Sequence, residues 1–254
     1  MLLKDKKGII LGVANSRSIA WSIAQAFHDE GARFAMTCQN EKIAKNVRRL
    51  ASKLSSCPLL SCDVTSNEQI ENVFQFLKQE FGTIDFLIHS IAYAPPKELR
   101  AKFTDVSREG FATTLEITAF SLTAVIQKAI PLMPKGGSIM TLTSLGGWRI
   151  VPNYHVMGVA KSALESSVRY LANDLGEQNI RVNGISPGPI RTVSAMGIRR
   201  FSQMLKTHQE RSPLRRNVKG SDVAKSAIFL ASDASSNITG EILFVDAGYH
   251  IIGI

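Results

Sequence analysis

The chain has 254 residues with 44% hydrophobic and 20% charged side chains, an ordinary globular composition that shifts nowhere sharply enough to mark a linker. No apolar run approaches the roughly 18 residues that span a bilayer, and no signal-peptide core precedes the first strand-like segment, so we expect a cytoplasmic protein without a membrane segment. The net charge of +9 suggests a nucleic-acid partner, but the aromatic residues do not interleave with the basic ones and no nucleic-acid-binding motif occurs, so none is predicted.

Strand-like and helix-like segments alternate from one end of the chain to the other. Short apolar runs bounded by Gly, Pro, Asn, Asp or Ser are typical of buried parallel strands, and they cover residues 8–11, 33–37, 58–62, 86–90, 138–142, 181–186 and 241–245. The helix-length segments between them cover 18–30, 41–54, 67–81, 108–133, 156–175 and 221–230. This alternation predicts one α/β domain over 1–254, with a Rossmann-like, doubly wound parallel sheet and helices on both faces.

The loop from Gly12 to Ile19 follows the first strand and opens the first helix. Backbone amides and the N-terminus of a helix in this position can face a pyrophosphate. The loop is not a Gly-x-Gly-x-x-Gly fingerprint, and a tight turn with Ser18 as a helix cap has the same sequence pattern. The loop alone therefore leaves both interpretations open.

The ends of the next three strands supply further candidates for a dinucleotide site. Cys38 to Glu41 follow the second strand, near the place where these folds select the adenosine ribose. Acid-containing surroundings suit an unphosphorylated ribose, which favours NADH over NADPH. After the third strand, Asp63-Val64 offers a carboxylate to the adenine amino group, and after the fourth, His89 to Ala92 form a small-residue edge that a cofactor can approach closely.

The cysteines and histidines show no metal-ligand spacing. Cys38, Cys57 and Cys62 are an odd number of thiols, and Cys57 and Cys62 lie five residues apart, which places them on opposite faces of a strand. The five histidines are scattered. We therefore expect core thiols and no metal site.

Tyr154 and Lys161 are seven residues apart within a segment of helical pattern. Seven residues nearly complete two helical turns, so both side chains are expected on one face, roughly 10 Å apart along the axis. A cation near a phenol favours the phenolate and lowers the phenol pKa toward useful acid chemistry, and it can also bind a ribose hydroxyl. A surface tyrosine and a solvated lysine would show the same spacing.

An insertion of about 190–219 follows the sixth strand, where helical patches such as 198–211 replace a prompt return to the sheet. Ligands bind at the carboxyl edge of such sheets, so we interpret the insertion as a mobile helical lid over the substrate. Between 191 and 219, eight Lys and Arg residues face the single acid Glu210. This excess suits either a solvated helical face or the docking of an acidic partner or a phosphate-bearing substrate.

With residues 183–192 and 245–248, these pieces resemble the short-chain dehydrogenase/reductase superfamily over nearly the whole chain. The combination of Gly12-x5-Ser18-Ile19, 89–95, Tyr154-x6-Lys161 and 188–192 is similar to the bacterial enoyl-[acyl-carrier-protein] reductases. Most carbonyl-reducing relatives place the tyrosine four residues before the lysine. This chain has Met157 there, which cannot donate a proton.

The resemblance implies NADH-dependent reduction of the trans-2 double bond of enoyl thioesters on acyl carrier protein, in bacterial type II fatty acid biosynthesis. Tyr154 would stabilise the enolate oxygen, and Lys161 would hold the nicotinamide ribose. A homotetramer is also implied, with 108–133 and 156–175 as candidate interfaces. The family's dinucleotide positions correspond to Gly12, Ser18, Ile19, Gln39, Asp63, Val64, Ile91, Lys161, Ile190 and Thr192, and its substrate positions to Ala94 and Tyr154.

Ser144 departs from the family pattern. Enoyl reductases commonly have a second tyrosine there, whereas the wider superfamily has a catalytic serine, so Ser144 is a third candidate catalytic residue. It either hydrogen-bonds a substrate carbonyl or caps its loop, and Trp148 in the same loop either packs or forms a wall for the substrate. Two rival functions are a reductase of ketones or alcohols that uses Ser144 and Tyr154, and a non-catalytic dinucleotide sensor or nucleic-acid binder.

Overall fold

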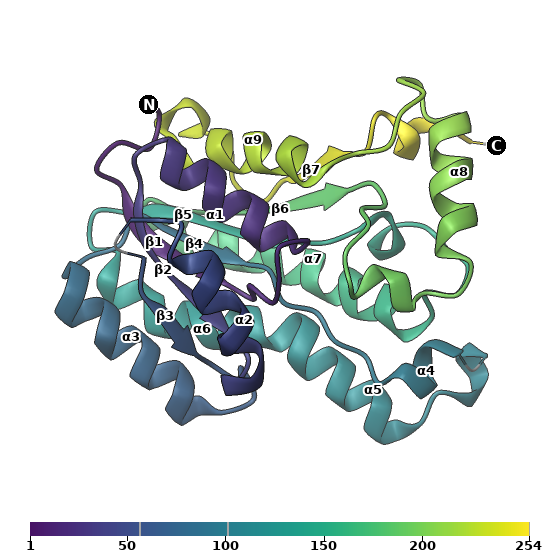
Figure 1. Ribbon diagram of the computed structural model, residues 1–254, viewed down its shortest axis with the longest axis horizontal. Helices are drawn as coiled ribbons and strands as arrows, with labels where there is room; N and C mark the ends of the chain where they lie inside the picture. The colour runs from purple at the N-terminus through teal and green to yellow at the C-terminus, as the bar shows by residue number, and fades with distance from the viewer. Residues whose placement is uncertain (56, 101, 254) are drawn as a thin grey trace.

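A seven-stranded parallel sheet forms the centre of the molecule in the computed structural model, which describes residues 1–253 except 56 and 101 (Figure 1). The strand order is β3-β2-β1-β4-β5-β6-β7, and every neighbouring pair is parallel. The predicted doubly wound α/β fold is confirmed. The strands are β1 Lys7–Leu11, β2 Arg33–Cys38, β3 Leu59–Ser61, β4 Phe86–His89, β5 Gly137–Leu142, β6 Ile180–Pro187 and β7 Ile242–Val245.

Helices cover both faces of this sheet. One face is covered by α1 Ile19–Asp29, α2 Glu41–Ala51 and α9 Gly220–Ala231, and the other by α3 Asn67–Phe81, α6 Ser121–Ala129 and α7 Val156–Leu175. The helix α5 Arg108–Leu115 precedes α6 and packs against α7. Two further helices, α4 Pro96–Arg100 and α8 Phe201–Arg211, lie at the end of the molecule toward which β6 points (Figure 1). The insertion predicted after the sixth strand is helical, as α8 and the short turn Ala195–Gly197, and its role as a lid stays a prediction.

The elements differ from the sequence expectation at four places. The strand β3 and the helix α2 are shorter than predicted, and α4 was not predicted. The expected helix over 108–133 is helical over Arg108–Leu132 but is interrupted by a π-helical turn at Glu116–Phe120 and ends in a 3-10 turn at Ile130–Leu132. Pro131 lies in that last turn and has no N–H to extend an α-helix.

The stretch Arg108–Leu132 is the one helix in the described part of the chain that has the length and mean hydropathy, 1.3, of a membrane span. Half of its most apolar 18-residue window is buried inside the protein. Burial of this kind is also expected of an apolar helix that covers a sheet. Glu116 and Lys128 lie within it, which is why no uninterrupted apolar run is visible in the sequence.

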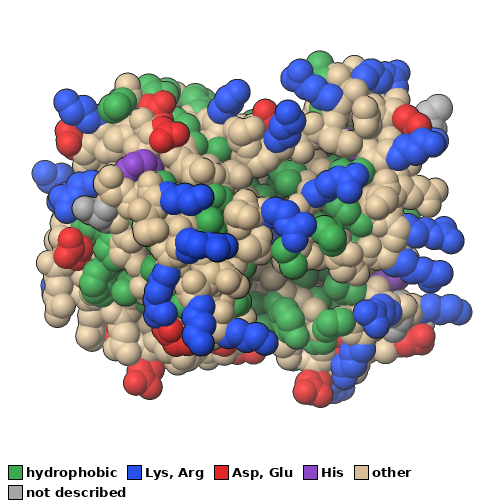
Figure 2. Space-filling model, in the orientation of Figure 1, with side chains coloured by type: hydrophobic (Ala, Val, Ile, Leu, Met, Phe, Trp, Pro, Cys, Tyr) green, Lys and Arg blue, Asp and Glu red, His purple; other side chains and the backbone are tan. Residues whose placement is uncertain are grey.

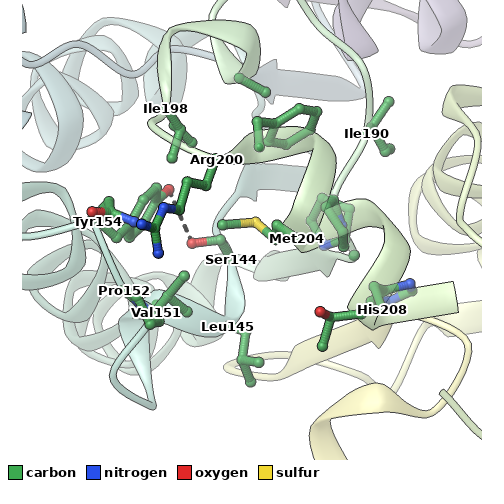
Figure 3. A pocket seen from close by; sticks show the side chains of 18 of the residues that line it. Ser144, Leu145, Val151, Pro152, Tyr154, Ile190, Ile198, Arg200, Met204 and His208 are labelled. Atoms are coloured by element: carbon green, nitrogen blue, oxygen red, sulfur yellow. Dashed lines mark hydrogen bonds between the residues drawn. The ribbon is translucent and has the colours of Figure 1, made fainter. Parts of the chain in front are cut away.

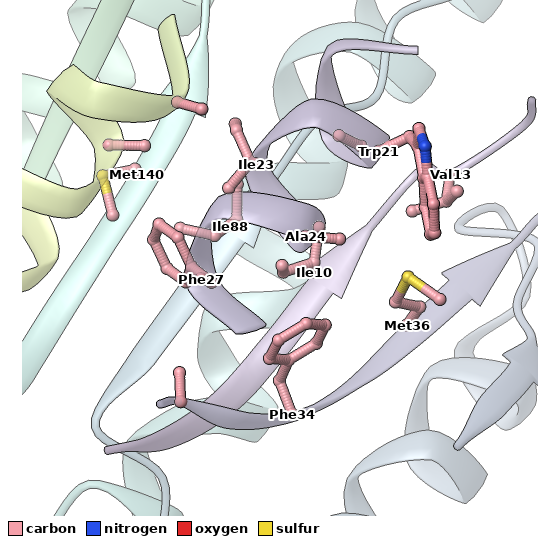
Figure 4. Packing of buried hydrophobic residues seen from close by; sticks show 14 of the residues in the cluster. Ile10, Val13, Trp21, Ile23, Ala24, Phe27, Phe34, Met36, Ile88 and Met140 are labelled. Atoms are coloured by element: carbon pink, nitrogen blue, oxygen red, sulfur yellow. The ribbon is translucent and has the colours of Figure 1, made fainter. Parts of the chain in front are cut away.

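Alternation along β1 shows how the strands build two separate cores. Ile9 and Leu11 point into the cluster beneath α3, α6 and α7, whereas Ile10 points into the cluster beneath α1, α2 and α9. Both faces are buried, as the continuous apolar runs of a parallel sheet require. In the second cluster, Phe27 lies near Ile10 and Ile88 (Figure 4). Its ring meets that of Phe86 edge to face with centroids 5.0 Å apart.

The thiols are components of these cores. Cys38 and Cys62 are buried and Cys57 is half-buried. Cys57 packs with the cluster beneath α1 and Cys62 with the cluster beneath α3, so they lie on opposite faces as predicted. Burial raises the pKa of Cys57 to about 12 and that of Cys62 to about 11, so both remain protonated at neutral pH. The described residues contain no group of three or more His, Cys, Asp or Glu side chains that could hold a metal ion.

Replacing Phe27 by Ala tests the core between the sheet and α1. Phe27 is completely buried against Phe86, so its truncation leaves a cavity, and we expect the free energy of unfolding to fall by about 3 to 5 kcal/mol. Urea unfolding followed by circular dichroism measures this change. Leu2→Ala, at a side chain that is 57% exposed, is the control and should change the free energy by less than about 0.5 kcal/mol.

Candidate active site

A pocket of about 520 Å³ opens at the carboxyl end of the sheet (Figure 3). Its walls come from the loop after β5, the turn before α7, the segment after β6, and α8. Most of the lining surface is apolar, as is typical of sites for small molecules, and the charged side chains among the lining are Arg199, Arg200 and Asp246. The predicted site residues among its lining are Ile19, Ser144, Tyr154, Ile190 and Thr192.

The loop after β1 is shaped by Gly12 and Ser18. Gly12 has a φ of +91°, and a Cβ there would lie 2.2 Å from the carbonyl oxygen of Ser90, so this position requires glycine. The Ser18 hydroxyl accepts hydrogen bonds from the backbone N–H groups of Ala14 at 3.2 Å and Asn15 at 3.0 Å. Ser18 makes no side-chain bond to α1. Its side chain therefore orders the loop rather than capping the helix, which was the alternative interpretation of this sequence.

Polar side chains at the ends of β2 and β3 form a hydrogen-bonded group. Gln39 Nε2 donates to Asp63 Oδ2 at 3.4 Å, and Thr65 donates to Asp63 Oδ1 from its N–H at 3.0 Å and its hydroxyl at 2.7 Å. Partial burial acts to raise the pKa of Asp63, but these hydrogen bonds outweigh it and hold the pKa below its usual value. The carboxylate is therefore ionised at neutral pH and available as an acceptor.

Glu41, at the start of α2, is held beside this group. Its carboxylate accepts from Arg48 Nη2 at 2.7 Å and from the Ser61 hydroxyl at 3.2 Å, and the bond from Arg48 is the main reason that the pKa of Glu41 lies below its usual value. Both partners are largely exposed. The edge of the sheet where these folds meet an adenosine ribose is thus acidic, and the nearby guanidinium already has a partner.

Lys161 is buried, 4% exposed, and lies in the second turn of α7. Its ammonium donates to the carbonyl oxygen of Leu142, at the end of β5, over 2.6 Å. Burial lowers the pKa of Lys161 to about 8, whereas the nearby carboxylate of Glu165 acts in the opposite direction. Lys161 is therefore mostly cationic at neutral pH, although its pKa lies only slightly above that pH.

Tyr154 does not lie on the same helix as Lys161, which corrects the sequence expectation. The helix α7 begins at Val156, and Tyr154 lies in the preceding turn. Asn153 and His155 both have positive φ, 64° and 43°, and this backbone path is incompatible with an α-helix. The turn lays the tyrosine ring against Gly146, where a Cβ would lie 2.4 Å from Tyr154 Cδ1.

The phenol of Tyr154 is protonated, which corrects a second expectation. Burial raises the pKa of Tyr154 above its usual value, and the charge of Glu165 adds to this effect, whereas a hydrogen bond from Ser144 opposes it. The predicted lowering by Lys161 does not occur, because the ammonium is directed at Leu142. A protonated phenol is the form that can donate a hydrogen bond.

Ser144 donates to the phenol oxygen of Tyr154 over 3.0 Å (Figure 3). Ser144 makes no capping bond in its loop, so that alternative is wrong. By accepting from Ser144, the phenol keeps its own proton for another acceptor. Trp148 is not among the residues that line the pocket. It is 58% exposed and packs on Phe244 with ring centroids 5.8 Å apart, so it has a packing role.

The other predicted residues lie along the same edge of the sheet. Gly12, Gln39, Asp63, Val64 and Ile91 follow β1, β2, β3 and β4, outside the lining of the pocket. Ala94 is buried and packs with Val156 and Met157, next to the ring of Tyr154. The structure therefore places these candidate dinucleotide residues at the ends of neighbouring strands that lead toward the pocket, and Lys161 is bonded to the end of β5, two residues before the pocket residue Ser144.

Several pocket residues were not singled out by sequence. The pocket is also lined from α8 by Phe201, Met204 and His208. They lie within the segment predicted as a lid, but the sequence did not indicate which residues of that segment face the pocket. His208 is 2% exposed, its ring stacks on Tyr249 with centroids 5.0 Å apart, and its Nδ1 lies 3.1 Å from Asn217 Oδ1. Tyr249 directly follows the closing motif at 245–248, which was the only available indication of its place.

Comparison with known proteins gives consistent similarities. The profile of a family described as "Enoyl-(Acyl carrier protein) reductase" matches residues 12–250. The chain is 50% identical to the enoyl-[acyl-carrier-protein] reductase [NADH] FabI of Bacillus cereus, over 99% of both chains. It is 48% identical to the enoyl-[acyl-carrier-protein] reductase [NADH] 1 of Rhizobium meliloti, over 100% of this chain and 93% of that protein.

Solved structures show the same similarity in three dimensions. The Bacillus cereus enoyl-acyl carrier protein reductase with NADP+ and indole naphthyridinone superposes with a TM-score of 0.98 at 50% identity, covering 100% of this chain and 99% of that one. The Anaplasma phagocytophilum reductase in complex with NAD superposes with a TM-score of 0.97 at 45% identity, covering 100% and 97%.

Proposed function

The chain belongs to the enoyl-[acyl-carrier-protein] reductase family, and we propose that it reduces the trans-2 double bond of enoyl thioesters on acyl carrier protein, in bacterial type II fatty acid biosynthesis. The observation that carries this proposal is a protonated phenol, Tyr154, held by Ser144 at the wall of a largely apolar pocket. A ketone reductase of this superfamily would need an acid at Met157, which is buried against Ala94. The cytoplasm is the compartment that we propose for this reaction.

The chain's residues fit NADH as the cofactor. The absence of a side chain at Gly12 lets the loop after β1 pass close to the carbonyl oxygen of Ser90, and the N-terminus of α1, which follows this loop, can face a pyrophosphate. When bound, NADH supplies the hydride for the β-carbon of the substrate. The residues that would hold it are Gly12, Ser18, Ile19, Gln39, Asp63, Val64, Ile91, Lys161, Ile190 and Thr192. Glu41 and its engaged Arg48 favour an unphosphorylated ribose.

Tyr154 is the group that would act on the reacting thioester. Reduction of the alkene places negative charge on the thioester oxygen, and a phenol O–H directed at that oxygen stabilises it. Ser144 acts through Tyr154, because its hydroxyl donates to the phenol and so fixes the direction of the phenol proton. Lys161 would hold a ribose hydroxyl of the cofactor, and its cation keeps the local potential positive.

Tyr154→Phe tests this role. Removal of one oxyanion donor should slow reduction about 10²-fold to 10³-fold, while the affinity for NADH remains unchanged because the ring is retained. Stopped-flow absorbance of NADH with crotonyl-CoA measures the rate, and fluorescence titration measures the affinity. An unchanged rate would remove Tyr154 from the mechanism. Preferential turnover of acetoacetyl-CoA by the parent would favour the ketone reductase, and NADH binding without any turnover would favour a sensor.

The basic lid is a candidate contact for the carrier protein. Lys and Arg side chains outnumber acidic ones on the face shown in Figure 2, including the end that carries α8, and Arg199 and Arg200 stand at the rim of the pocket just before α8. Acyl carrier proteins are acidic, so this surface favours their approach at low salt. The excess of Lys and Arg residues between 191 and 219 would then bind the carrier protein and not only keep this face solvated.

Charge reversal at Arg199 and Arg200 tests this contact. The double change to Glu should raise the KM for the carrier-linked substrate about tenfold or more, because two attractive contacts become repulsive. It should raise the KM for crotonyl-CoA much less, because this substrate has no acidic protein surface to dock. Lys4→Glu with Lys53→Glu, at two exposed positions remote from the lid, alters the net charge equally and should affect neither substrate. Equal effects of the lid variant on both substrates would contradict docking.

We also propose a homotetramer, assembled through α7 and the stretch Arg108–Leu132. These neighbouring helices carry exposed apolar side chains, including Phe120 at 57% and Tyr170 at 72% exposure. Exposed aromatic residues on adjacent long helices are typical of subunit interfaces.

Phe120→Glu should therefore dissociate the tetramer into smaller species, because a buried carboxylate without a partner opposes association. Sedimentation velocity measures the change. Leu2→Glu introduces the same charge at an exposed position on another part of the surface and should leave the tetramer intact. A parent protein that sediments as a monomer would overturn the proposal.

A further inference from the structure

Three consecutive residues at the end of β5 each hold one group of the site. The carbonyl oxygen of Leu142 accepts from Lys161 at 2.6 Å, and the hydroxyl of Thr143 donates to Glu165 Oε1 at 2.5 Å. The hydroxyl of Ser144 donates to Tyr154 at 3.0 Å. Lys161 and Glu165 are one turn apart on α7. The same end of β5 is thus bonded to α7 twice and to the tyrosine once.

Glu165 belongs to this hydrogen-bonded group but has no role in the proposed reaction. It is 9% exposed, although a buried carboxylate costs several kcal/mol unless it is hydrogen-bonded and compensated. Its carboxylate lies directly against Gly147, where a Cβ would lie 2.3 Å from Glu165 Oε1. A glycine is therefore needed in the loop to admit this carboxylate, just as Gly146 admits the ring of Tyr154.

We propose that Glu165 is a positioning residue for the reaction: through Thr143 it fixes the loop that carries Ser144, and its negative charge keeps Lys161 in the cationic form that holds the cofactor ribose. This inference rests on the proposed function. One buried side chain would then control both the position of Tyr154 and the charge of Lys161.

The charged and titratable groups around Lys161 leave this task to Glu165. From β4, His89 faces Lys161 but is uncharged, because burial lowers its pKa to about 3, and its ring nitrogens lie 2.9 Å from Thr141 Oγ1 and 2.8 Å from Ser121 Oγ. Tyr154 is a neutral phenol. On α7, Glu165 acts to raise the pKa of Lys161 against burial, and the exposed Arg169 supports the ionised form of Glu165 from the next turn.

The sign of the expected pH dependence follows from these charges. Burial raises the pKa of Glu165, so its charge is lost as the pH falls through that pKa, but Lys161 remains cationic at such a pH and this loss does not limit NADH binding. The Lys161 ammonium, whose pKa is lowered to about 8, is lost as the pH rises, and binding should weaken on the alkaline side. Without the charge of Glu165, the alkaline limit should move to lower pH.

Glu165→Gln tests this inference, because the amide oxygen can still accept from Thr143 while the charge is gone. The dissociation constant of NADH is measured by fluorescence from about pH 5 to about pH 10, with crotonyl-CoA turnover in parallel. The loss of NADH affinity between about pH 7 and about pH 9 should be at least threefold greater than in the parent, since each unit of pKa corresponds to a tenfold change. Asp174→Asn removes the same charge from an exposed position on α7 and should reproduce the parent profile.

Two further variants keep the test decisive if Glu165→Gln does not fold. Arg169→Gln, at an exposed position, should raise the pKa of Glu165 and weaken its charge, and so move the alkaline limit of NADH binding to lower pH, as Glu165→Gln does. Thr143→Val retains the carboxylate but frees the loop, so it should lower turnover more than it alters NADH affinity. Parent-like pH profiles in the folded charge variants would overturn the inference. A parent that neither binds NADH nor reduces crotonyl-CoA would instead overturn the proposed function.

Discussion

The hydrogen bond from the Lys161 ammonium to the carbonyl of Leu142 is the contact on which the rest of the site depends. It joins the C-terminal end of a central strand to the second turn of α7, and it fixes the cation where parallel strands present their carbonyl groups. Where a strand of a parallel sheet ends, its last carbonyl oxygens no longer accept hydrogen bonds from a neighbouring strand. An ammonium is a suitable donor for one of them. The two residues after Leu142 then fall within reach of α7 and of the turn before it.

The electrostatics of the site follow from the same contact. A cation buried beneath a mostly apolar pocket loses hydration, and its pKa falls to about 8. The pKa of the Tyr154 phenol is raised, so the phenol stays protonated. The site thus keeps a positive centre below and a neutral donor at the wall, which suits a reaction that develops negative charge on a thioester oxygen. Had the lysine been aimed at the phenol, the phenolate would have been favoured, and a phenolate cannot donate a hydrogen bond to an anion.

Much of the fold was predictable because a parallel sheet buries both faces. The seven apolar runs and their flanking breakers gave the strands, and α3 and α7 began and ended where their patterns did. The position of Tyr154 was not predictable, because the left-handed conformations of Asn153 and His155 leave no periodic signal and the helical spacing to Lys161 was imitated by a turn. The role of Glu165 was hidden for a different reason: its significance depends on Thr143 and Gly147, which are remote in the chain and meet it only through packing.

Gly146 and Gly147 also have a consequence for how such a protein can diversify. The catalytic loop has no spare volume, because the tyrosine ring and the buried carboxylate occupy the space that two side chains would need. The opposite wall, with Ile198, Phe201 and Met204 from the lid, is built from a segment outside the sheet ladder. New acyl specificities can therefore evolve by exchange of residues on one wall, while the chemistry is inherited unchanged on the other.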